Sequence, residues 1–233
     1  MTVTDYILSD KTAIIRMDDG KANALSYAMM DEVEAALNRA EQEASAVVIT
    51  GRPGRFCAGF DLREMTKGAD SARALVTRGA DFLLRLYLFP KPLVVACSGH
   101  ALAGGALTVL TGDLRIGAQG AFRIGLNEVQ IGMPVPILAM ELARDRLNPH
   151  ALQEATLFAR IYTPDEAVEA GYLDRVIDEA TLLEEATREA ARLAALPGNA
   201  YARTKTILRE RTVNYVRQNL EMDMIRLTPP AAT

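Results

Sequence analysis

The sequence predicts an α/β core followed by a helical region, and two observations carry this prediction. Short β-branched runs alternate with helical patterns over the first two thirds of the 233 residues, as expected for a sheet covered by helices. From Glu179 onward the pattern is helical, apart from a break near Pro197-Gly198. We therefore expect a core over residues 1–195 and a C-terminal helical extension over residues 196–233, with no flexible linker between them.

The composition is that of an ordinary globular protein, with 49% hydrophobic and 24% charged residues and a net charge of −4. No basic stripe with interleaved aromatic residues is present, so no nucleic-acid partner is expected. No apolar run approaches the ~18 residues of a membrane span, and the N-terminus lacks a signal-peptide pattern. Cys57 and Cys97 have no metal-ligand spacing and are expected to be reduced, buried thiols. These features predict a cytoplasmic protein without a metal site.

The elements are expected in a regular order along the chain. Ser26 is a good N-cap for a helix over 26–43, and Thr163-Pro164 with Glu166 and Gly171 marks the start and end of another. Strands are expected at 5–9, 12–17, 46–50, 92–96, 114–117, 122–124 and 173–177. Further helices are expected at 61–65, 71–88, 106–110, 136–146, 149–158 and on either side of Pro197, before a Pro229-Pro230 tail.

A buried strand followed by a small-residue loop and a helix start occurs twice, with loops at 51–61 and 97–105. The first N–H groups of a helix have no partner inside it, and glycine lets the backbone approach a ligand closely. Two such loops can present two backbone N–H groups to one oxygen atom. The pair Gly104-Gly105 equally permits tight packing of a helix on a strand, so both interpretations stay open here.

Glu128 is the candidate general base, because the apolar residues around it favour desolvation and a raised pKa. The alternative is that Asn127 caps a short helix and Glu128 only sits favourably at its N-terminus. His100 is interpreted as a hydrogen-bonded loop residue, since Ser98 lacks the G-x-S-x-G pattern of a nucleophile elbow. No nucleotide-binding glycine motif is present, which removes support for hydride or phosphoryl transfer.

Taken together, these segments resemble the crotonase (enoyl-CoA hydratase/isomerase) superfamily. The resemblance is carried by Asp113 and by residues 23–26 (NALS), 56–62 (FCAGFDL), 101–105 (ALAGG), 124–128 (IGLNE) and 167–174 (AVEAGYLD). It implies a ββα-spiral core with a C-terminal helical region that serves in trimerisation or as a lid, and assembly as a homotrimer or hexamer. Family hydratases extend further past the last helix than this chain does.

The resemblance also implies a substrate and a set of site residues. The substrate is an acyl-CoA thioester, with no separate cofactor, and the backbone N–H groups of Phe60 and Gly104 form its oxyanion hole. Lys21 is implied near the nucleotide portion of coenzyme A, although it is equally well explained as a solvated loop lysine. The implied substrate-binding residues are Lys21, Ala22, Ala24, Ala58, Gly59, Asp61, Leu62 and Asn127.

Two positions predict the reaction within this family. Family hydratases carry a glutamate where this chain has Leu107, and a second where it has Glu128. A single base suffices to move a proton between C2 and C4, and residues 124–128 look like the Δ3,Δ2-enoyl-CoA isomerase branch. We expect an isomerase with Glu128 as base and Asn127 positioning the substrate or the base. The alternatives are a hydratase or other crotonase-type hydrolase or lyase, and a non-catalytic acyl-CoA-binding or scaffold protein.

Overall fold

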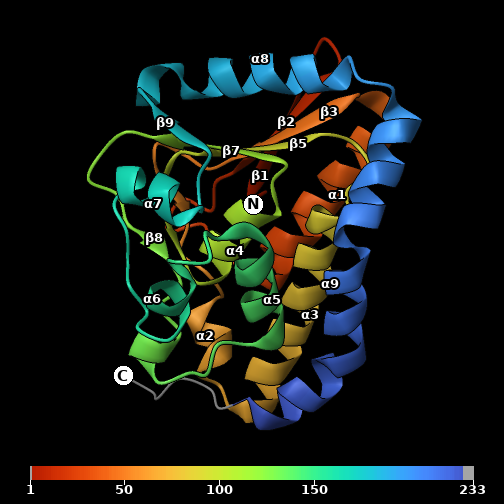
Figure 1. Ribbon diagram of the computed structural model, residues 1–233. Helices are drawn as coiled ribbons and strands as arrows, with labels where there is room; N and C mark the ends of the chain where they lie inside the picture. Colours follow the sequence, from red (N-terminus) through yellow and green to blue (C-terminus); the bar gives the residue numbers. More distant parts are fainter. Residues whose placement is uncertain (1, 228–233) are drawn as a thin grey trace.

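The computed structural model describes residues 2–227, which form two β-sheets surrounded by helices (Figure 1). The larger sheet has the strand order β1-β2-β3-β5-β7-β9, and the smaller sheet has the order β4-β6-β8. The strands are β1 (Thr4–Ser9), β2 (Thr12–Met17), β3 (Ala46–Thr50), β4 (Gly54–Cys57), β5 (Leu93–Cys97), β6 (Gly99–Leu102), β7 (Leu114–Ala118), β8 (Ile124–Gly125) and β9 (Arg175–Ile177). The α/β class predicted from the sequence is confirmed.

Helices cover both sheets. They are α1 (Tyr27–Glu43), α2 (Leu62–Met65), α3 (Ala69–Tyr87), α4 (Gly104–Thr111), α5 (Ile137–Arg146), α6 (Leu152–Thr156), α7 (Pro164–Ala170), α8 (Leu182–Ala194) and α9 (Gly198–Arg226), with short 3-10 turns η1 (Val129–Ile131) and η2 (Glu179–Thr181). Ser26 caps α1, and Thr163 forms a capping box with Glu166 at the start of α7, both as predicted.

The central strands β3 and β5 of the large sheet are buried on both faces. The hairpin strands β1 and β2 are antiparallel, and every later strand of this sheet pairs in parallel. Helix α8 lies across one face, where Leu182, Ala186 and Ala190 pack on the core strands, and α1 lies against the other (Figure 1). A parallel strand covered on both sides reads as a continuous apolar run, which is why β3 and β5 could be located from the sequence.

The small sheet is where the sequence prediction was incomplete. Residues 54–57 and 99–102 were expected in the two small-residue loops at 51–61 and 97–105. Both segments are instead parallel strands, β4 and β6. Their backbones approach so closely that a Cβ on Gly99 would fall 2.1 Å from the carbonyl carbon of Gly54. Short strands with small residues lack the apolar alternation that identifies a strand.

Helix α6 is shorter than the predicted helix over 149–158. It spans Leu152–Thr156 only, because Ala159 adopts a positive φ of 49° that a right-handed helix cannot contain. Leu157 and Phe158, which follow α6 directly, are 61% and 62% exposed.

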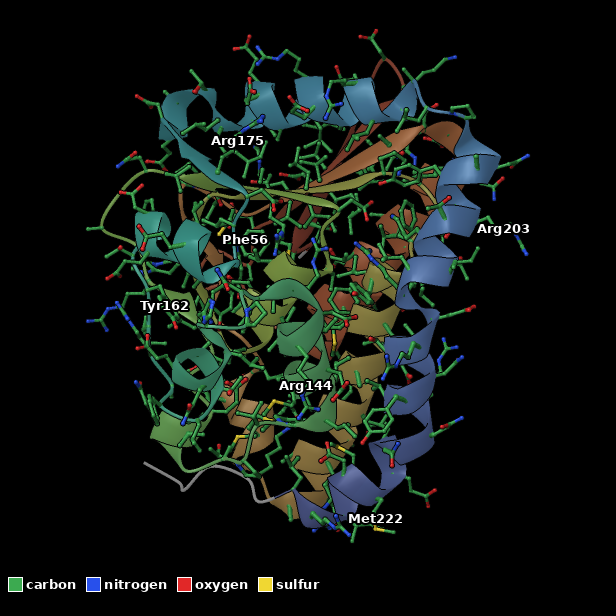
Figure 2. All side chains as sticks on the ribbon, viewed as in Figure 1. Phe56, Arg144, Tyr162, Arg175, Arg203 and Met222 are labelled. Atoms are coloured by element: carbon green, nitrogen blue, oxygen red, sulfur yellow. The ribbon has the colours of Figure 1, made fainter. Side chains whose placement is uncertain are left out.

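Helix α9 packs against α3 and α5 (Figure 1). Near its start, Asp113, whose side chain is 10% exposed, accepts hydrogen bonds from Lys205 Nζ at 2.5 Å and Tyr201 OH at 2.7 Å, and it pairs with Arg209 Nη2 at 2.9 Å. The outward face carries exposed residues such as Met222, while Phe56 lies in the core (Figure 2). The division at residue 195 remains a prediction, and the Pro229-Pro230 tail lies outside the described residues.

Candidate active site

Three loops meet at one edge of the small sheet. Because β4, β6 and β8 are parallel, the loops that leave their C-terminal ends lie side by side. These loops contain Phe60, Gly104 and Glu128 respectively, which are the three residues predicted for catalysis. The backbone joins two of the loops directly, since Ala103 N donates to Gly125 O at 3.0 Å. The carboxyl edge of parallel strands is the usual place for a site in α/β proteins.

The first two loops are in contact through glycine. A Cβ on Gly59 would lie 2.9 Å from Leu102 O and 3.3 Å from Gly104 N, and Gly59 has a positive φ of 96°. Between them, Ala103 holds a φ of 47°, a strained conformation for a residue with a side chain. Strain of this kind persists only where surrounding structure enforces it, and here it turns the chain sharply into α4.

The backbone N–H groups of Phe60 and Gly104 donate to no protein acceptor within residues 2–227. The neighbouring groups explain why, since the pairing between Leu25 and the second loop uses Gly59 O and Asp61 N. Gly104 is the first residue of α4, so its N–H lies at the positive end of the helix dipole. Both groups are therefore free to bind a developing negative charge.

The glycine pair is compatible with both interpretations that the sequence left open. A Cβ on Gly105 would fall 2.0 Å from Cys57 O, so this glycine is required for α4 to pack on β4. A Cβ on Gly104 would meet the Phe60 ring at 3.4 Å, which brings the two predicted oxyanion residues together. Gly105 is therefore needed for helix packing, whereas Gly104 lies beside Phe60, as expected for the predicted oxyanion hole.

An apolar cavity of about 130 Å³ lies beneath these loops. Glu128 is the one titratable residue among the described residues that line it, and Leu107 of α4 forms part of the same wall. The lining residues are Ala58, Phe60, Leu62, Met65, Val76, Ala103, Leu107, Asn127, Glu128, Ile131, Met133 and Pro136. Met65 and Val76 were missed from the sequence, because on α2 and α3 they have the same spacing as ordinary core residues.

Glu128 is only 5% exposed, and burial raises its pKa to about 7. Its Oε2 atom has no protein partner in the described part of the chain. The backbone of this loop is tight: Met133 N donates to Glu128 O at 2.9 Å, and Gly132 closes the turn with a φ of 79°. The alternative that Asn127 caps a helix here is wrong, because Asn127 Oδ1 also has no partner.

The residues implied for the rest of the ligand lie on a neighbouring loop. Asn23, fully buried, donates to Met17 O at 2.9 Å and Phe56 O at 3.2 Å, while Ala58 N donates to Ala22 O at 3.0 Å. The segment that includes Lys21, Ala22 and Ala24 is therefore joined to the loop that contains Phe60. Lys21 is exposed, and none of these three residues lines the cavity.

Asp61 and His100 have structural contacts. Asp61 caps α2 by accepting from Arg63 N at 2.9 Å. His100 Nδ1 accepts from Arg123 N at 3.0 Å, its ring packs edge-on against Phe122, and it does not line the cavity, as expected for a loop histidine. Burial raises the pKa of both Cys57 and Cys97 to about 12, which keeps these thiols protonated and unreactive.

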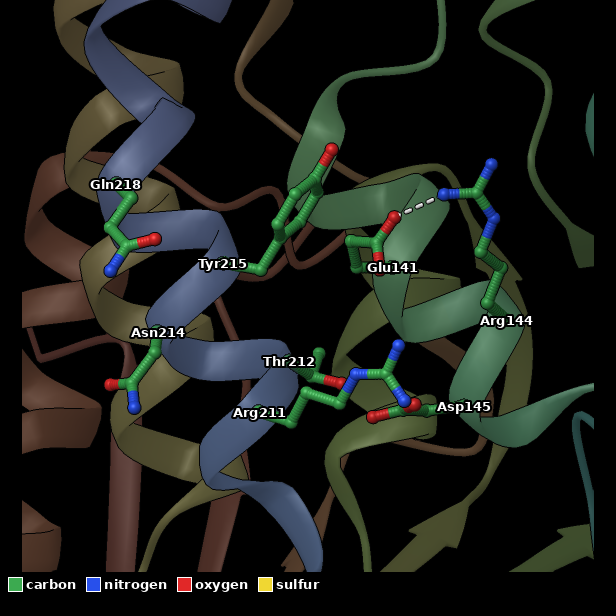
Figure 3. A pocket seen from close by; sticks show the side chains of 8 residues that line it. All are labelled: Glu141, Arg144, Asp145, Arg211, Thr212, Asn214, Tyr215 and Gln218. Atoms are coloured by element: carbon green, nitrogen blue, oxygen red, sulfur yellow. Dashed lines mark hydrogen bonds and ion pairs between the residues drawn. The ribbon is translucent and has the colours of Figure 1, made fainter.

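A larger groove of about 650 Å³ lies elsewhere, between α5 and α9 (Figure 3). Three of its charged groups have partners of their own: Arg144 pairs with Glu141, and Asp145 accepts from Tyr87 OH at 2.8 Å. It contains none of the predicted site residues. Among residues 2–227 no group of three or more His, Cys, Asp and Glu side chains could hold a metal ion. No helix over that span is long and apolar enough to cross a membrane.

Comparison with known proteins identifies the family. The enoyl-CoA hydratase/isomerase family model matches residues 9–230, and the chain belongs to this family. Human mitochondrial enoyl-CoA delta isomerase 1 is 32% identical over 207 residues, which are 87% of this chain and 68% of that protein. A probable enoyl-CoA hydratase of Rhodobacter capsulatus is 33% identical over 208 residues, covering 86% and 78% respectively.

A solved structure of the same family has the same fold as this chain. An enoyl-CoA hydratase/isomerase family protein from Pseudomonas syringae superimposes with a TM-score of 0.93 at 39% identity, covering 95% of this chain and 96% of that one. The crotonase fold expected from the sequence is confirmed. Isomerases and hydratases resemble this chain to a similar degree, so these relatives do not distinguish the two reactions.

Proposed function

We propose that this protein is an enoyl-CoA isomerase that converts a 3-enoyl-CoA thioester to the 2-enoyl isomer, with Glu128 as its single base. One observation carries the proposal: a single buried carboxylate lines an apolar cavity whose wall also contains Leu107. Hydration needs one group to activate water and a second to handle the α-proton. Moving a proton within one substrate needs only one group that first accepts the proton and then returns it.

The reaction begins when the thioester carbonyl oxygen accepts hydrogen bonds from the N–H groups of Phe60 and Gly104. These donors stabilise negative charge on that oxygen and so make the C2 proton more acidic. Glu128 takes the C2 proton, and the electron pair left at C2 delocalises into a dienolate over the carbonyl and the C3–C4 double bond. Glu128 then delivers the proton to C4, which leaves the double bond between C2 and C3.

The environment of Glu128 suits both steps. A pKa near 7 means that the carboxylate can accept a proton and give it back at neutral pH without a large energetic cost in either direction. The apolar walls exclude water from the dienolate, which would favour its return to an enoyl product over side reactions. Asn127, beside the base, is proposed to position the substrate or the base.

The remaining site residues are proposed to bind coenzyme A. Ala58, Gly59, Asp61 and Leu62 follow the acyl-CoA along the first oxyanion loop. Lys21, Ala22 and Ala24 lie towards its nucleotide portion, on the loop that Asn23 anchors. Assembly as a homotrimer or hexamer and a cytoplasmic location remain predictions of the sequence.

The proposal is tested by supplying a 3-enoyl-CoA and a 2-enoyl-CoA separately and identifying the products. We expect the 3-enoyl substrate to give the 2-enoyl isomer, with little 3-hydroxyacyl-CoA from the 2-enoyl substrate. Glu128→Gln should lower isomerisation by at least 10²-fold, a typical contribution of general acid–base catalysis. Activity of the parent should rise with pH through about 7, as Glu128 ionises.

Two outcomes would favour the competing functions. Robust hydration of the 2-enoyl substrate would support a hydratase, and release of free coenzyme A or carbon dioxide would support another hydrolase or lyase of the family. If the parent binds acyl-CoA but turns over none of these substrates, a non-catalytic acyl-CoA-binding role gains support. Unchanged turnover in Glu128→Gln would show that Glu128 is not the base.

A further inference from the structure

Helix α5 begins without a cap from its own sequence. Its N-cap residue is Pro136, which makes no side-chain cap hydrogen bond, and the first turn of α5 contains no acidic residue. The first N–H groups of a helix need acceptors from outside it, and side-chain oxygens commonly provide them. The side chains of the preceding segment, Met133-Pro134-Val135-Pro136, contain no oxygen. An acceptor must therefore come from another part of the fold or from solvent.

Helix α9 supplies this acceptor. Ile137 N, in the first turn of α5, donates to Asp223 Oδ2 at 2.8 Å. Asp223 is partly buried and lies 86 positions further along the chain. A carboxylate here also interacts favourably with the positive end of the α5 dipole. The start of α5 is thus fixed by a residue of a different helix.

The part of α9 that carries Asp223 is itself packed in place. Met224 and Leu227 are buried, at 6% and 4% exposure, and belong to the main hydrophobic core. Arg73 Nη2 of α3 donates to Ile225 O at 3.4 Å, and α9 lies beside both α3 and α5 (Figure 1). Asp223 is therefore presented to α5 from an ordered, anchored turn of helix.

The segment between Glu128 and α5 forms part of the cavity wall and is held at both ends. Met133 and Pro136 line the cavity together with Glu128. At one end Met133 N donates to Glu128 O at 2.9 Å, and at the other Ile137 N donates to Asp223. The two prolines between these hydrogen bonds have fixed φ angles, so this part of the wall has little freedom while both bonds are made.

We propose that Asp223 is a positioning residue for the acyl chain: by capping α5 it fixes the wall formed by Met133 and Pro136, on which the chain of the substrate packs. The inference rests on the proposed function, in which the cavity of about 130 Å³ receives the acyl group. An apolar wall contributes to binding only while it stays in contact with the chain, since a small gap already loses much of the van der Waals attraction.

The competing explanation is that Asp223 only stabilises α5. Its loss would then lower folding stability, but the folded variant would bind ligands like the parent. Asp223→Ala removes the acceptor, whereas Asp223→Asn keeps an oxygen that can accept from Ile137 N. Asp178→Ala is the matched control, because Asp178 also accepts from a backbone N–H, that of Ala180 at 2.8 Å, and does not line the cavity.

The experiment is isothermal titration calorimetry with hexanoyl-CoA and with free coenzyme A. Hexanoyl-CoA has no double bond to move, so this measurement does not depend on activity. Asp223→Ala should bind hexanoyl-CoA about ten-fold more weakly than the parent, the low end of what one methylene group is worth in a fitted apolar pocket. Its affinity for free coenzyme A should stay within about two-fold of the parent. Asp223→Asn and Asp178→Ala should resemble the parent with both ligands.

Kinetics separate an effect on the chain from an effect on the base. With 3-hexenoyl-CoA, KM of Asp223→Ala should rise about ten-fold while kcat stays within about two-fold, as expected when only binding energy is lost. A further measurement uses the parent alone and so does not depend on how Asp223→Ala folds. Hexanoyl-CoA should slow amide hydrogen exchange at Ile137 several-fold more than free coenzyme A does, because a chain packed on the wall favours the capped state.

Three results would overturn the proposal: equal hexanoyl-CoA affinity in the parent and Asp223→Ala, an equal loss of affinity for both ligands, or exchange at Ile137 that hexanoyl-CoA does not slow. If the binding and exchange effects occur but the parent isomerises no 3-enoyl-CoA, the proposed function fails and the positioning role stands. If the parent isomerises 3-enoyl-CoA and Asp223→Ala binds hexanoyl-CoA as the parent does, the positioning role fails and the proposed function stands.

Discussion

Gly59 lies so close to Gly104 that a Cβ on Gly59 would come within 3.3 Å of the Gly104 nitrogen and 2.9 Å of Leu102 O. This contact sets the separation of the two loops that carry the free N–H groups. Both atoms belong to backbone, so neither can move aside as the end of a flexible side chain could. The spacing of the proposed oxyanion hole therefore depends on the absence of a side chain at residue 59.

Gly59→Ala is expected to reduce activity by more than its loss of folding stability can explain. The substitution combines a positive φ with a backbone clash, and it should lower the free energy of unfolding by about 1–3 kcal/mol. Isomerase activity of the folded variant should fall at least ten-fold, because the donors separate. Gly68→Ala is the control, since Gly68 also has a positive φ but nothing within 4 Å; equal activity losses in both variants would contradict the prediction.

Glu128→Gln is expected to change the pH dependence of stability. Its carboxyl has a folded-state pKa of about 7 against an ordinary value of 4.5, so the native state binds more protons between these values. The parent should therefore lose stability as pH rises through this window, by roughly 3 kcal/mol in total. The Glu128→Gln variant should not show this loss of unfolding free energy, because its amide does not ionise.

The measurement is chemical denaturation from pH 4 to pH 8. The difference in unfolding free energy between Glu128→Gln and the parent should grow across this range in favour of the variant. Glu43→Gln, on the exposed end of α1, is the control and should run parallel to the parent. Parallel curves for Glu128→Gln as well would mean that the carboxylate is well solvated in the folded protein.

Leu107→Glu would place a second carboxylate in the wall of the cavity. Two like charges close together raise the pKa of one of them, so the acid limb of the pH profile should move to higher pH than in the parent. We also expect measurable hydration of a 2-enoyl-CoA, which Leu107→Gln should lack. An unmoved acid limb in a folded Leu107→Glu protein would show that residue 107 does not share the reaction space of Glu128.

Asp113→Asn is expected to be strongly destabilising. The substitution leaves the buried cations Lys205 and Arg209 without their carboxylate, which typically costs about 3–5 kcal/mol. Replacing Glu43, whose partner Arg39 is about half exposed, should cost less than about 1 kcal/mol. Thermal or chemical denaturation of both variants tests this, and similar losses would argue against Asp113 as the anchor of α9.

Local signals in the sequence located much of the fold. The Ser26 cap and the Thr163 capping box are patterns of four residues or fewer, and the structure has both at the predicted positions. The strand at 54–57 and the strand at 99–102 were not predicted, because pairing between small residues depends on the partner strand. The positive φ of Ala159, which helps to end α6, could not be predicted from an alanine in the sequence.

The candidate site was predictable to a similar extent. Glu128 stands out from its apolar sequence neighbours, whereas Leu107 was singled out by the family resemblance, and the structure brings both to one cavity. Met65 and Val76 line the same cavity from helices whose apolar faces look uniform in sequence.

The three adjoining loops of the small sheet would contribute different groups to the proposed site. Two would contribute backbone N–H donors, and the third would contribute the carboxylate of Glu128. Main-chain donors persist through most side-chain replacements, so the half of the site that would bind a carbonyl is insensitive to residue type outside its glycines. Replacements at residue 107 or near Glu128 could therefore change the reaction while the carbonyl stays bound in one orientation. This is consistent with a family whose members at about 30% identity bear the names of both isomerases and hydratases.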